Sequence, residues 1–358
     1  MRQAGLFGLS DHLKRLSAHG DPLEELSRIV DFETFRPTLV AALAYGDGVK
    51  GGRPPYDPVA MLKVLILAAQ NNVSDARMEY LIRDRLSWLR FLGFDLGAVT
   101  PDANTIRLFR EKLTEAGALD AVFTDFDRQL KERGYLAMGG QIVDATLVAA
   151  PKQRNTEPEK SAIKEGKTAA EIWPEEPARA AQKDTDARWT LKFAKGRSAA
   201  DGKPQIDIAI PSFGYKSSIA ICRAFGFIRK GKVTDGARFD GRMLRDVVTN
   251  DNTASDVWAD TAYRSQANEK WLKAQGRVSR IHRKKPRGKP MPDHVRRGNA
   301  TKSKVRARVE HVFAQQKAKM GLFIRTIGIK RAEAKITLAN LAYNMNRLIF
   351  HERRAFMG

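Results

Sequence analysis

Apolar side chains in the first third of the chain recur every three or four positions. The clearest series lies near the start, at Leu13, Leu16, Leu23, Leu26 and Ile29. This period predicts amphipathic helices, each with one buried face. A break rich in glycine and proline covers residues 46–58, and Asp57-Pro58 at its end has the form of a helix start. Residues 1–135 are therefore expected to form a helical N-terminal domain.

The pattern changes after residue 140. Residues 141–149 are apolar and rich in β-branched side chains, which predicts a strand. Residues 152–187 are polar and charged, and we expect them to form an exposed insertion. Further strands are predicted at residues 205–210, 217–223, 226–233, 255–260 and 277–282, and helices at 240–249, 265–275, 300–319 and 329–347. Three strands after the insertion suggest an antiparallel meander, and the whole order predicts an α/β domain with a mixed sheet over residues 136–350.

Net charge changes this picture most. The chain has 63 lysines and arginines against 41 acidic residues, a formal net charge of +22. Such an excess destabilises a compact protein by self-repulsion, so it indicates a polyanionic partner. Nucleic acid is the leading candidate, because each neutralised phosphate releases counterions and adds affinity. The alternative is a generally basic protein.

Composition also excludes several classes of protein. Cys222 is the only cysteine, so the chain can form neither an internal disulfide nor a thiolate-rich zinc site. The longest unbroken apolar stretch, residues 64–69, is far too short to span a bilayer. The first residues lack the extended apolar region of a secretory signal. We therefore expect a cytoplasmic protein without a membrane partner.

Residues 277–308 form the most basic part of the chain. This segment holds 13 lysines and arginines, and Asp293 is its only acid. Its prolines and glycines, at residues 286–292, argue against regular structure there. A flexible cationic segment is suited to contact with a DNA backbone, and a solvated linker is the alternative.

Three acids stand out by their positions. Asp144 lies within an apolar strand, where a carboxylate is costly unless it is paired or binds a cation. Asp260 ends the predicted strand at 255–260, and Glu310 lies in a long helix with basic surroundings. Each acid alone also fits a structural hydrogen bond or ion pair.

The helix around Glu310 has two neighbouring faces. Val305, Val309 and Val312 follow helical spacing and mark a buried stripe. Arg306, Glu310 and Lys317 follow the same spacing on an adjacent face. This arrangement fits either a surface salt-bridge ladder or a metal-binding glutamate beside cations that grip DNA phosphates.

The sequences around these acids carry a specific resemblance. They are Val-Asp-Ala-Thr-Leu-Val at Asp144, Val-Trp-Ala-Asp-Thr-Ala-Tyr-Arg at Asp260, and Arg-Val-Glu-His-Val-Phe at Glu310. Together they resemble the acidic triad of bacterial insertion-sequence transposases, most closely the group called IS-five. Further matching stretches are residues 213–216, 234–237 and 324–348. The family's catalytic helix carries Tyr, Arg, Glu and Lys at fixed intervals, and Ser303 here takes the place of the tyrosine.

The resemblance implies a ribonuclease-H-like catalytic core preceded by a helical domain for DNA binding or assembly. Asp144, Asp260 and Glu310 would be catalytic and would hold two Mg²⁺ ions, with Mn²⁺ as a substitute. Water would free a 3′-hydroxyl at the element's end, and that hydroxyl would attack target DNA. The candidate DNA-contacting residues are Lys216, Tyr263, Arg283, Lys284, Lys285, Arg306, Lys317 and Arg325. The histidines form no cluster with metal-ligand spacing.

The implied partners are the element's terminal inverted repeats and target DNA, bound by a homodimer associated with the nucleoid. Two other functions remain open from the residues. The chain could be a nuclease that cleaves DNA without joining it. It could also be a DNA-binding regulator without catalysis, whose acids are structural.

Overall fold

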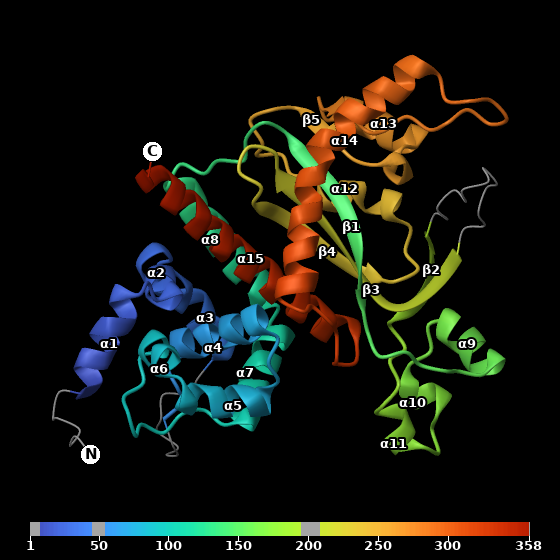
Figure 1. Ribbon diagram of the computed structural model, residues 1–358. Coiled ribbons are helices and arrows are strands. Elements are labelled where there is room, and N and C mark those ends of the chain that lie inside the picture. The colour runs from blue at the N-terminus through green and yellow to red at the C-terminus, as the bar shows by residue number, and fades with distance from the viewer. Residues whose placement is uncertain (1–7, 45–53, 195–207, 358) are drawn as a thin grey trace, which may run out of the picture.

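The computed structural model describes residues 8–44, 54–194 and 208–357, in which helices precede and flank one mixed sheet (Figure 1). Most of the glycine-rich break at 46–58 and the first residues of the strand predicted at 205–210 lie outside these ranges. Within them, no helix is both long and apolar enough to cross a membrane.

Helices make up the first part of the chain, as the apolar period predicts. They are α1 (Gly8–Ala18), α2 (Pro22–Ile29), η1 (Glu33–Phe35), α3 (Arg36–Leu43), α4 (Pro58–Asn71), α5 (Asp75–Asp84), α6 (Leu86–Leu92), α7 (Ala103–Glu115) and α8 (Ala118–Glu132). Asp57 caps α4 by accepting a hydrogen bond from the Ala60 N–H at 2.9 Å, so the predicted helix start is confirmed. Ser74 and Asp102 cap α5 and α7 in the same way.

Within the described ranges, the sheet has six strands. They are β1 (Gln141–Ala149), β2 (Arg188–Ala194), β3 (Ile208–Cys222), β4 (Ile228–Asp235), β5 (Asp256–Trp258) and β6 (Val278–Ser279). The strand order is β2-β3-β1-β5-β6, with β4 also paired to β3. β1 is antiparallel to β3 and parallel to β5, and β5 is parallel to β6, so the predicted mixed sheet is confirmed.

The predicted meander is wrong in one respect. Residues 208–210 of one expected strand and residues 217–222 of the next belong to a single long strand, β3. Its first half pairs with β2, at the end of the polar insertion, and its second half pairs with β4. β2 escaped prediction because its alternation is short and follows a highly polar stretch.

The polar insertion carries α9 (Glu157–Lys164), α10 (Ala169–Ile172) and α11 (Pro177–Ala180). Although most of its side chains are exposed, Trp173 and Asp184 are buried. Both carboxylate oxygens of Asp184 accept hydrogen bonds from the Tyr215 hydroxyl, at 2.8 and 2.7 Å. The insertion is therefore anchored to β3 rather than loosely attached.

Two glycines allow the sheet to pass a tight crossing. A Cβ on Gly214 would lie 2.2 Å from the Val148 carbonyl oxygen, and one on Gly236 would lie 2.7 Å from the Gly214 oxygen. The Gly236 N–H donates to that same oxygen at 3.0 Å. The stretches 213–216 and 234–237, which carry part of the family resemblance, therefore meet where β1, β3 and β4 come together.

Helices cover both faces of the sheet. On one face α12 (Leu244–Val247) and α13 (Gln266–Ala274) pack against Val143 and Ala259. On the other, α14 (Asp293–Ala314) and α15 (Ile329–Met357) pack against Ile142 and Trp258. Figure 1 shows α14 crossing β1. Since side chains alternate along a strand, Asp144 lies on the same face as Ile142, toward α14.

The helix predicted at 300–319 begins earlier, at Asp293, and ends in a π turn over Gln315–Lys319. About half of the basic segment at 277–308 is therefore helical, which corrects the expectation of irregular structure. The prolines of this segment all precede the helix, and Pro292 occupies its N-cap position. Asn299 also fixes the first turns, since its amide exchanges two hydrogen bonds with the Arg283 backbone, at 3.0 and 2.9 Å.

α15 joins the two halves of the chain. It packs against α2, α4, α7 and α8, and also against β3 and β4. One apolar core accordingly contains Leu62 of α4, Phe227 beside β4 and Leu338 of α15. A domain boundary near residue 135 stays a prediction.

Candidate active site

Parallel pairing brings Asp144 and Asp260 level with each other. The β1–β5 register pairs Gln141 with Val257 and Ile142 with Trp258. Asp144 and Asp260 each lie two residues beyond Ile142 and Trp258, on the face of the sheet toward α14. The two carboxylates therefore lie level with each other, with Asp144 in the first half of β1 and Asp260 just beyond the carboxyl end of β5.

Asp144 is a buried carboxylate with one cationic partner. It is 8% exposed, and its Oδ2 accepts a hydrogen bond from an Arg306 guanidinium nitrogen at 2.7 Å. Its Oδ1 accepts from the Ala145 N–H at 2.9 Å. Burial raises the pKa of Asp144 to about 6, and nearby Asp260 adds to the rise while Arg306 opposes it.

Asp260 also orders the backbone after β5. It caps a short turn, η3 (Thr261–Tyr263), where its Oδ1 accepts from the Ala262 N–H at 2.8 Å. This use of one oxygen fixes the side-chain direction and leaves the other oxygen available. Asp260 is half-buried, so that oxygen is within reach of solvent and ligand.

Glu310 lies apart from the two aspartates. It is exposed, and it has no hydrogen bond or ion pair within the described part of the chain. The same residues contain no group of three acids, histidines or cysteines poised to hold a metal ion. Two of the three predicted acids are thus brought together, and the third is not.

The flank of α14 that carries Glu310 nevertheless faces the acids. Arg306, one turn before Glu310, reaches Asp144. Lys317, two turns after it, donates a hydrogen bond from Nζ to the Thr146 hydroxyl at 2.5 Å. Residues 306 and 310 share one side of α14, and Lys317 lies beyond that helix in the π turn, so the exposed Glu310 falls between these two contacts along the chain.

His282 is a site residue that sequence reasoning missed. The β5–β6 register pairs Asp256 with Val278, and the His282 N–H donates to the Ala259 oxygen at 3.1 Å. His282 is therefore level with Asp260, in the extended segment that follows β6. Burial and the cations Arg306 and Lys302 lower the pKa of its imidazole. Its position at the end of a third parallel strand was the available signal.

Tyr263 occupies a different place from the one expected. Its ring is fully buried among the residues under α12 and α13, so this structure does not present it to DNA. Its hydroxyl has no hydrogen-bond partner among the described residues, and burial, with Asp144 and Asp240 nearby, raises its pKa. Within the residues that the structure describes, the Tyr263 hydroxyl, His282 Nε2 and Arg306 Nε are buried polar atoms without a hydrogen-bond partner.

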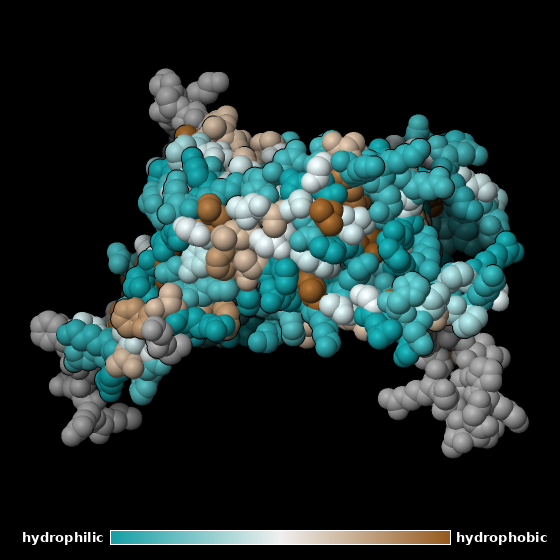
Figure 2. All heavy atoms as spheres, turned by 90° about the horizontal axis from the view of Figure 1, so that it is seen from above, coloured by the Kyte–Doolittle hydropathy of each residue, from teal (hydrophilic) through white to brown (hydrophobic). Residues whose placement is uncertain are grey.

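The other candidate DNA contacts divide into two groups. Arg283, Lys284 and Lys285 are exposed just beyond β6, and Arg325 is exposed after α14. Lys216 is instead held within the protein, since it donates to the Arg238 oxygen at 2.7 Å and pairs with Asp240 at 2.8 Å. Figure 2 shows that the face above the sheet is largely hydrophilic, with small scattered apolar spots.

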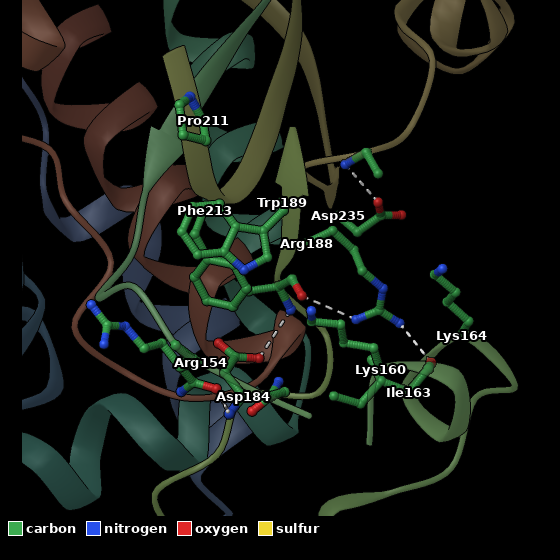
Figure 3. Close-up of a pocket in the computed structure, with 14 residues that line it drawn as sticks. Arg154, Lys160, Ile163, Lys164, Asp184, Arg188, Trp189, Pro211, Phe213 and Asp235 are labelled. Carbon is green, nitrogen blue, oxygen red and sulfur yellow. Dashed lines mark hydrogen bonds between the residues drawn. The ribbon is translucent and has the colours of Figure 1, made fainter. Parts of the chain in front are cut away.

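A large cavity lies away from these acids. It has a volume of about 870 Å³ and lies between the insertion and the β2–β3 hairpin (Figure 3). Trp189 and Phe213 form an aromatic wall, with ring centroids 5.4 Å apart, and Ile163 of α9 contributes to the lining. None of the three predicted catalytic acids lines it.

Two protein families match this chain. The family described as a transposase domain (DUF772) matches residues 11–112, within the N-terminal helices. The family described as the transposase DDE domain matches residues 136–345, more than half of the chain and the whole of the sheet. No solved structure matches the chain.

Proposed function

We propose a reaction, and the residues that carry it, for this chain, which belongs to the family of transposases with a DDE domain and is a DNA transposase. The enzyme cleaves DNA at the ends of an insertion sequence and transfers the freed 3′-hydroxyl strand into target DNA. Asp144, Asp260 and Glu310 form its catalytic triad. The observation that carries this proposal is the level placement of Asp144 and Asp260 on adjacent parallel strands, facing α14.

The carboxylates suit a divalent cation. Divalent ions are general in this family, and Asp144 is a buried acid beside a second acid, with a single cationic partner. Carboxylate oxygens are the ligands that Mg²⁺ and Mn²⁺ prefer, and we propose Mg²⁺ as the natural ion. Asp144, Asp260 and Glu310 would hold two such ions, which would polarise the scissile phosphodiester and offset the charge of its transition state.

Arg306 has two partners in turn, first Asp144 and then a DNA phosphate. In the DNA-free protein it supplies the positive charge that the buried Asp144 needs. When DNA binds, the guanidinium turns to a phosphate oxygen beside the scissile bond, a geometry that arginine accepts readily. The carboxylate of Asp144 is then free to act as a ligand, and Glu310 completes the set from the same flank of α14. DNA binding therefore assembles the site.

Other residues position the DNA. Lys317 stands next to Thr146 on β1, and Arg283, Lys284 and Lys285 extend from the end of β6 toward the backbone. His282, whose lowered pKa favours the neutral imidazole, can accept a hydrogen bond from the attacking water or hydroxyl beside Asp260. The hydroxyl attacks phosphorus directly, the opposite P–O bond breaks, and no protein nucleophile is needed.

The larger organisation is proposed on the same basis. The sheet with its flanking helices is a ribonuclease-H-like core over residues 136–350, and residues 1–135 form a DNA-binding and assembly domain. The chain belongs to the IS-five group. It acts in the cytoplasm at the nucleoid, as a homodimer that brings two inverted repeats to one target.

The wild-type protein tests this function in one assay. It is mixed with a labelled duplex that ends in the inverted repeat flanking the gene, a target plasmid, and Mg²⁺ or Mn²⁺. Joined product that depends on the added ion supports a transposase that transfers strands. Cleaved ends without joined product would instead identify a nuclease. Binding alone, indifferent to the ion, would identify a non-catalytic DNA-binding protein.

A further inference from the structure

A second cavity lies where the N-terminal helices meet the C-terminal segment. It has a volume of about 510 Å³ and is lined by α5, α7, the segment after α14, and α15. It shares no residue with the acid site or with the cavity in Figure 3. Its charged lining residues are Asp75, Arg77, Arg110, Glu111, Arg325, Arg331 and Lys335.

The lining of this cavity contains more cations than its acids can pair with. Arg110 forms two hydrogen bonds with Asp75, both at 2.7 Å, and Arg331 pairs with Glu111 at 3.0 Å. Neither acid is left to pair with Arg77, Arg325 or Lys335. Arg77 lies over the Tyr80 ring, 4.7 Å from its centroid, and Arg325 donates to the Asn72 side-chain oxygen at 3.1 Å.

Lys335 is the least satisfied of these cations. It lies on α15 and is half-buried, yet its ammonium has no hydrogen bond or ion pair within the ranges that the structure describes. Burial, together with the charges of Arg110 and Arg325, lowers the pKa of this group. A cation held in such a place costs stability unless an anion joins it. The cavity in front of it provides the room.

We propose that this cavity is a phosphate site that receives a DNA backbone phosphate, bound by Lys335, Arg325 and Arg77. A planar guanidinium matches phosphate oxygens in pairs, and a lysine ammonium adds a point charge. The proposal rests on the proposed function, because it takes the DNA held at the acids to be the source of the phosphate.

The position of the cavity favours DNA as that source. The Ile324 N–H donates to the Ala149 oxygen at 2.9 Å, which holds Arg325 at the carboxyl end of β1. In Figure 1 the segment after α14 runs between the N-terminal helices and the sheet. Ala149 lies five residue steps along β1 from Asp144, a distance of about 17 Å. This distance equals the rise of about five base pairs along DNA. Lys317, which contacts Thr146, lies at an intermediate point along β1.

Salt-dependent DNA binding by the full-length protein tests the site. The wild type, Lys335→Gln and the matched control Lys330→Gln are titrated with an inverted-repeat duplex over a series of salt concentrations. Lys330 is an exposed lysine on the same helix and does not line this cavity. We expect Lys335→Gln to reduce the slope of log K against log salt by about one and the control to leave it unchanged. Arg77→Gln should give a similar reduction.

Thermal melts with inorganic phosphate separate the two sources of the anion. Without ligand, Lys335→Gln should melt no lower than the wild type, because an unpaired cation is removed and the fold is retained. Phosphate should stabilise the wild type more than chloride of equal ionic strength does, and this gain should vanish in Lys335→Gln. Phosphate stabilisation with an unaltered DNA slope would assign the site to a free phosphate and overturn the DNA assignment. Equal slopes and equal melts in all variants would overturn the site itself.

The result is independent of catalysis. Strand transfer is not measured in these titrations, so a chain that binds DNA without joining it can still show the slope change. Conversely, a joining enzyme whose Lys335→Gln slope equals the wild type would retain the proposed function and lose this site.

Discussion

At the scale of single residues, the residues of the site differ in how far the sequence predicts their roles. Asp144 could be predicted because it interrupts an apolar strand, and its burial agrees with that reasoning. For His282 the end of the predicted strand at 277–282 was a signal, but its link to Asp260 depends on the register between β5 and β6, which local pattern does not encode. The sequence predicts a DNA contact for Tyr263, and only the packing under α12 and α13 shows that this residue is buried.

The folded protein is expected to gain stability when Asp144 loses its charge. Since burial raises the pKa of Asp144 to about 6, the ionised carboxylate weakens the native state above that pH. Asp144→Asn should therefore stabilise the metal-free protein by about 3 kcal/mol at pH 7. The gain should shrink as pH falls from 6 and vanish below the unfolded value near 4, where the acid is neutral in both states. Denaturant unfolding across this range measures it, and a gain independent of pH would contradict the pKa assignment.

At the scale of elements, α14 presents its cations and Glu310 from one flank. Helical spacing predicted this sharing of a side, and the contacts of Arg306 with Asp144 and Lys317 with Thr146 agree with it. The start of the helix could not be predicted, because Asn299 and the Arg283 backbone fix it through a contact between distant segments. The long β3 strand likewise depends on partners on both sides.

A carboxylate on α14 should serve only from the flank that faces β1. The double variant Glu310→Gln, His311→Glu keeps the charge of the helix but turns the acid about 100° around its axis, toward solvent. We expect strand transfer to fall by about 100-fold or more. His311→Gln alone is the control and should retain activity, since His311 is exposed. A doubly substituted protein that joins DNA at the wild-type rate would rule out a specific role for the Glu310 position.

The crossing at Gly214 should tolerate no side chain. Gly214 has φ of 152°, and an added Cβ would collide with the Val148 carbonyl oxygen. Gly214→Ala should lower the free energy of unfolding by about 2 kcal/mol or more. Gly298→Ala, in α14 with open space around it, is the matched control and should be neutral or slightly stabilising. Equal melting of the two variants would mean that the strands separate more easily at this crossing than the structure implies.

At the scale of the whole molecule, sequence predicted the mixed sheet and its helices but not how the halves join. The charge excess of +22 indicated DNA, and the family match agrees with it. The shared core along α15 could not be foreseen, because it depends on contacts between residues far apart in the chain, such as Gln70 and Asn346.

The basic residues after β6 should dominate the salt dependence of DNA binding. Neutralising Arg283, Lys284 and Lys285 together to glutamine should reduce the slope of log K against log salt by about 2.7, if each contacts one phosphate. Lys230→Gln with Lys232→Gln, on the exposed surface of β4, is the comparison and should change the slope little. Equal changes per removed charge would indicate a diffuse field rather than a defined contact.

The central claim is that Asp144, Asp260 and Glu310 act together in joining DNA. Strand transfer with Mg²⁺ tests it most directly, in proteins carrying Asp144→Asn, Asp260→Asn or Glu310→Gln, beside Asp256→Asn as a control. Asp256 is an acid of β5, the strand that precedes Asp260, and it pairs with Arg280 at the surface. We predict that each of the three variants loses about 100-fold or more of the joined product while still binding DNA, and that the control keeps it. Joining at the wild-type rate by any one of the three variants would contradict the claim.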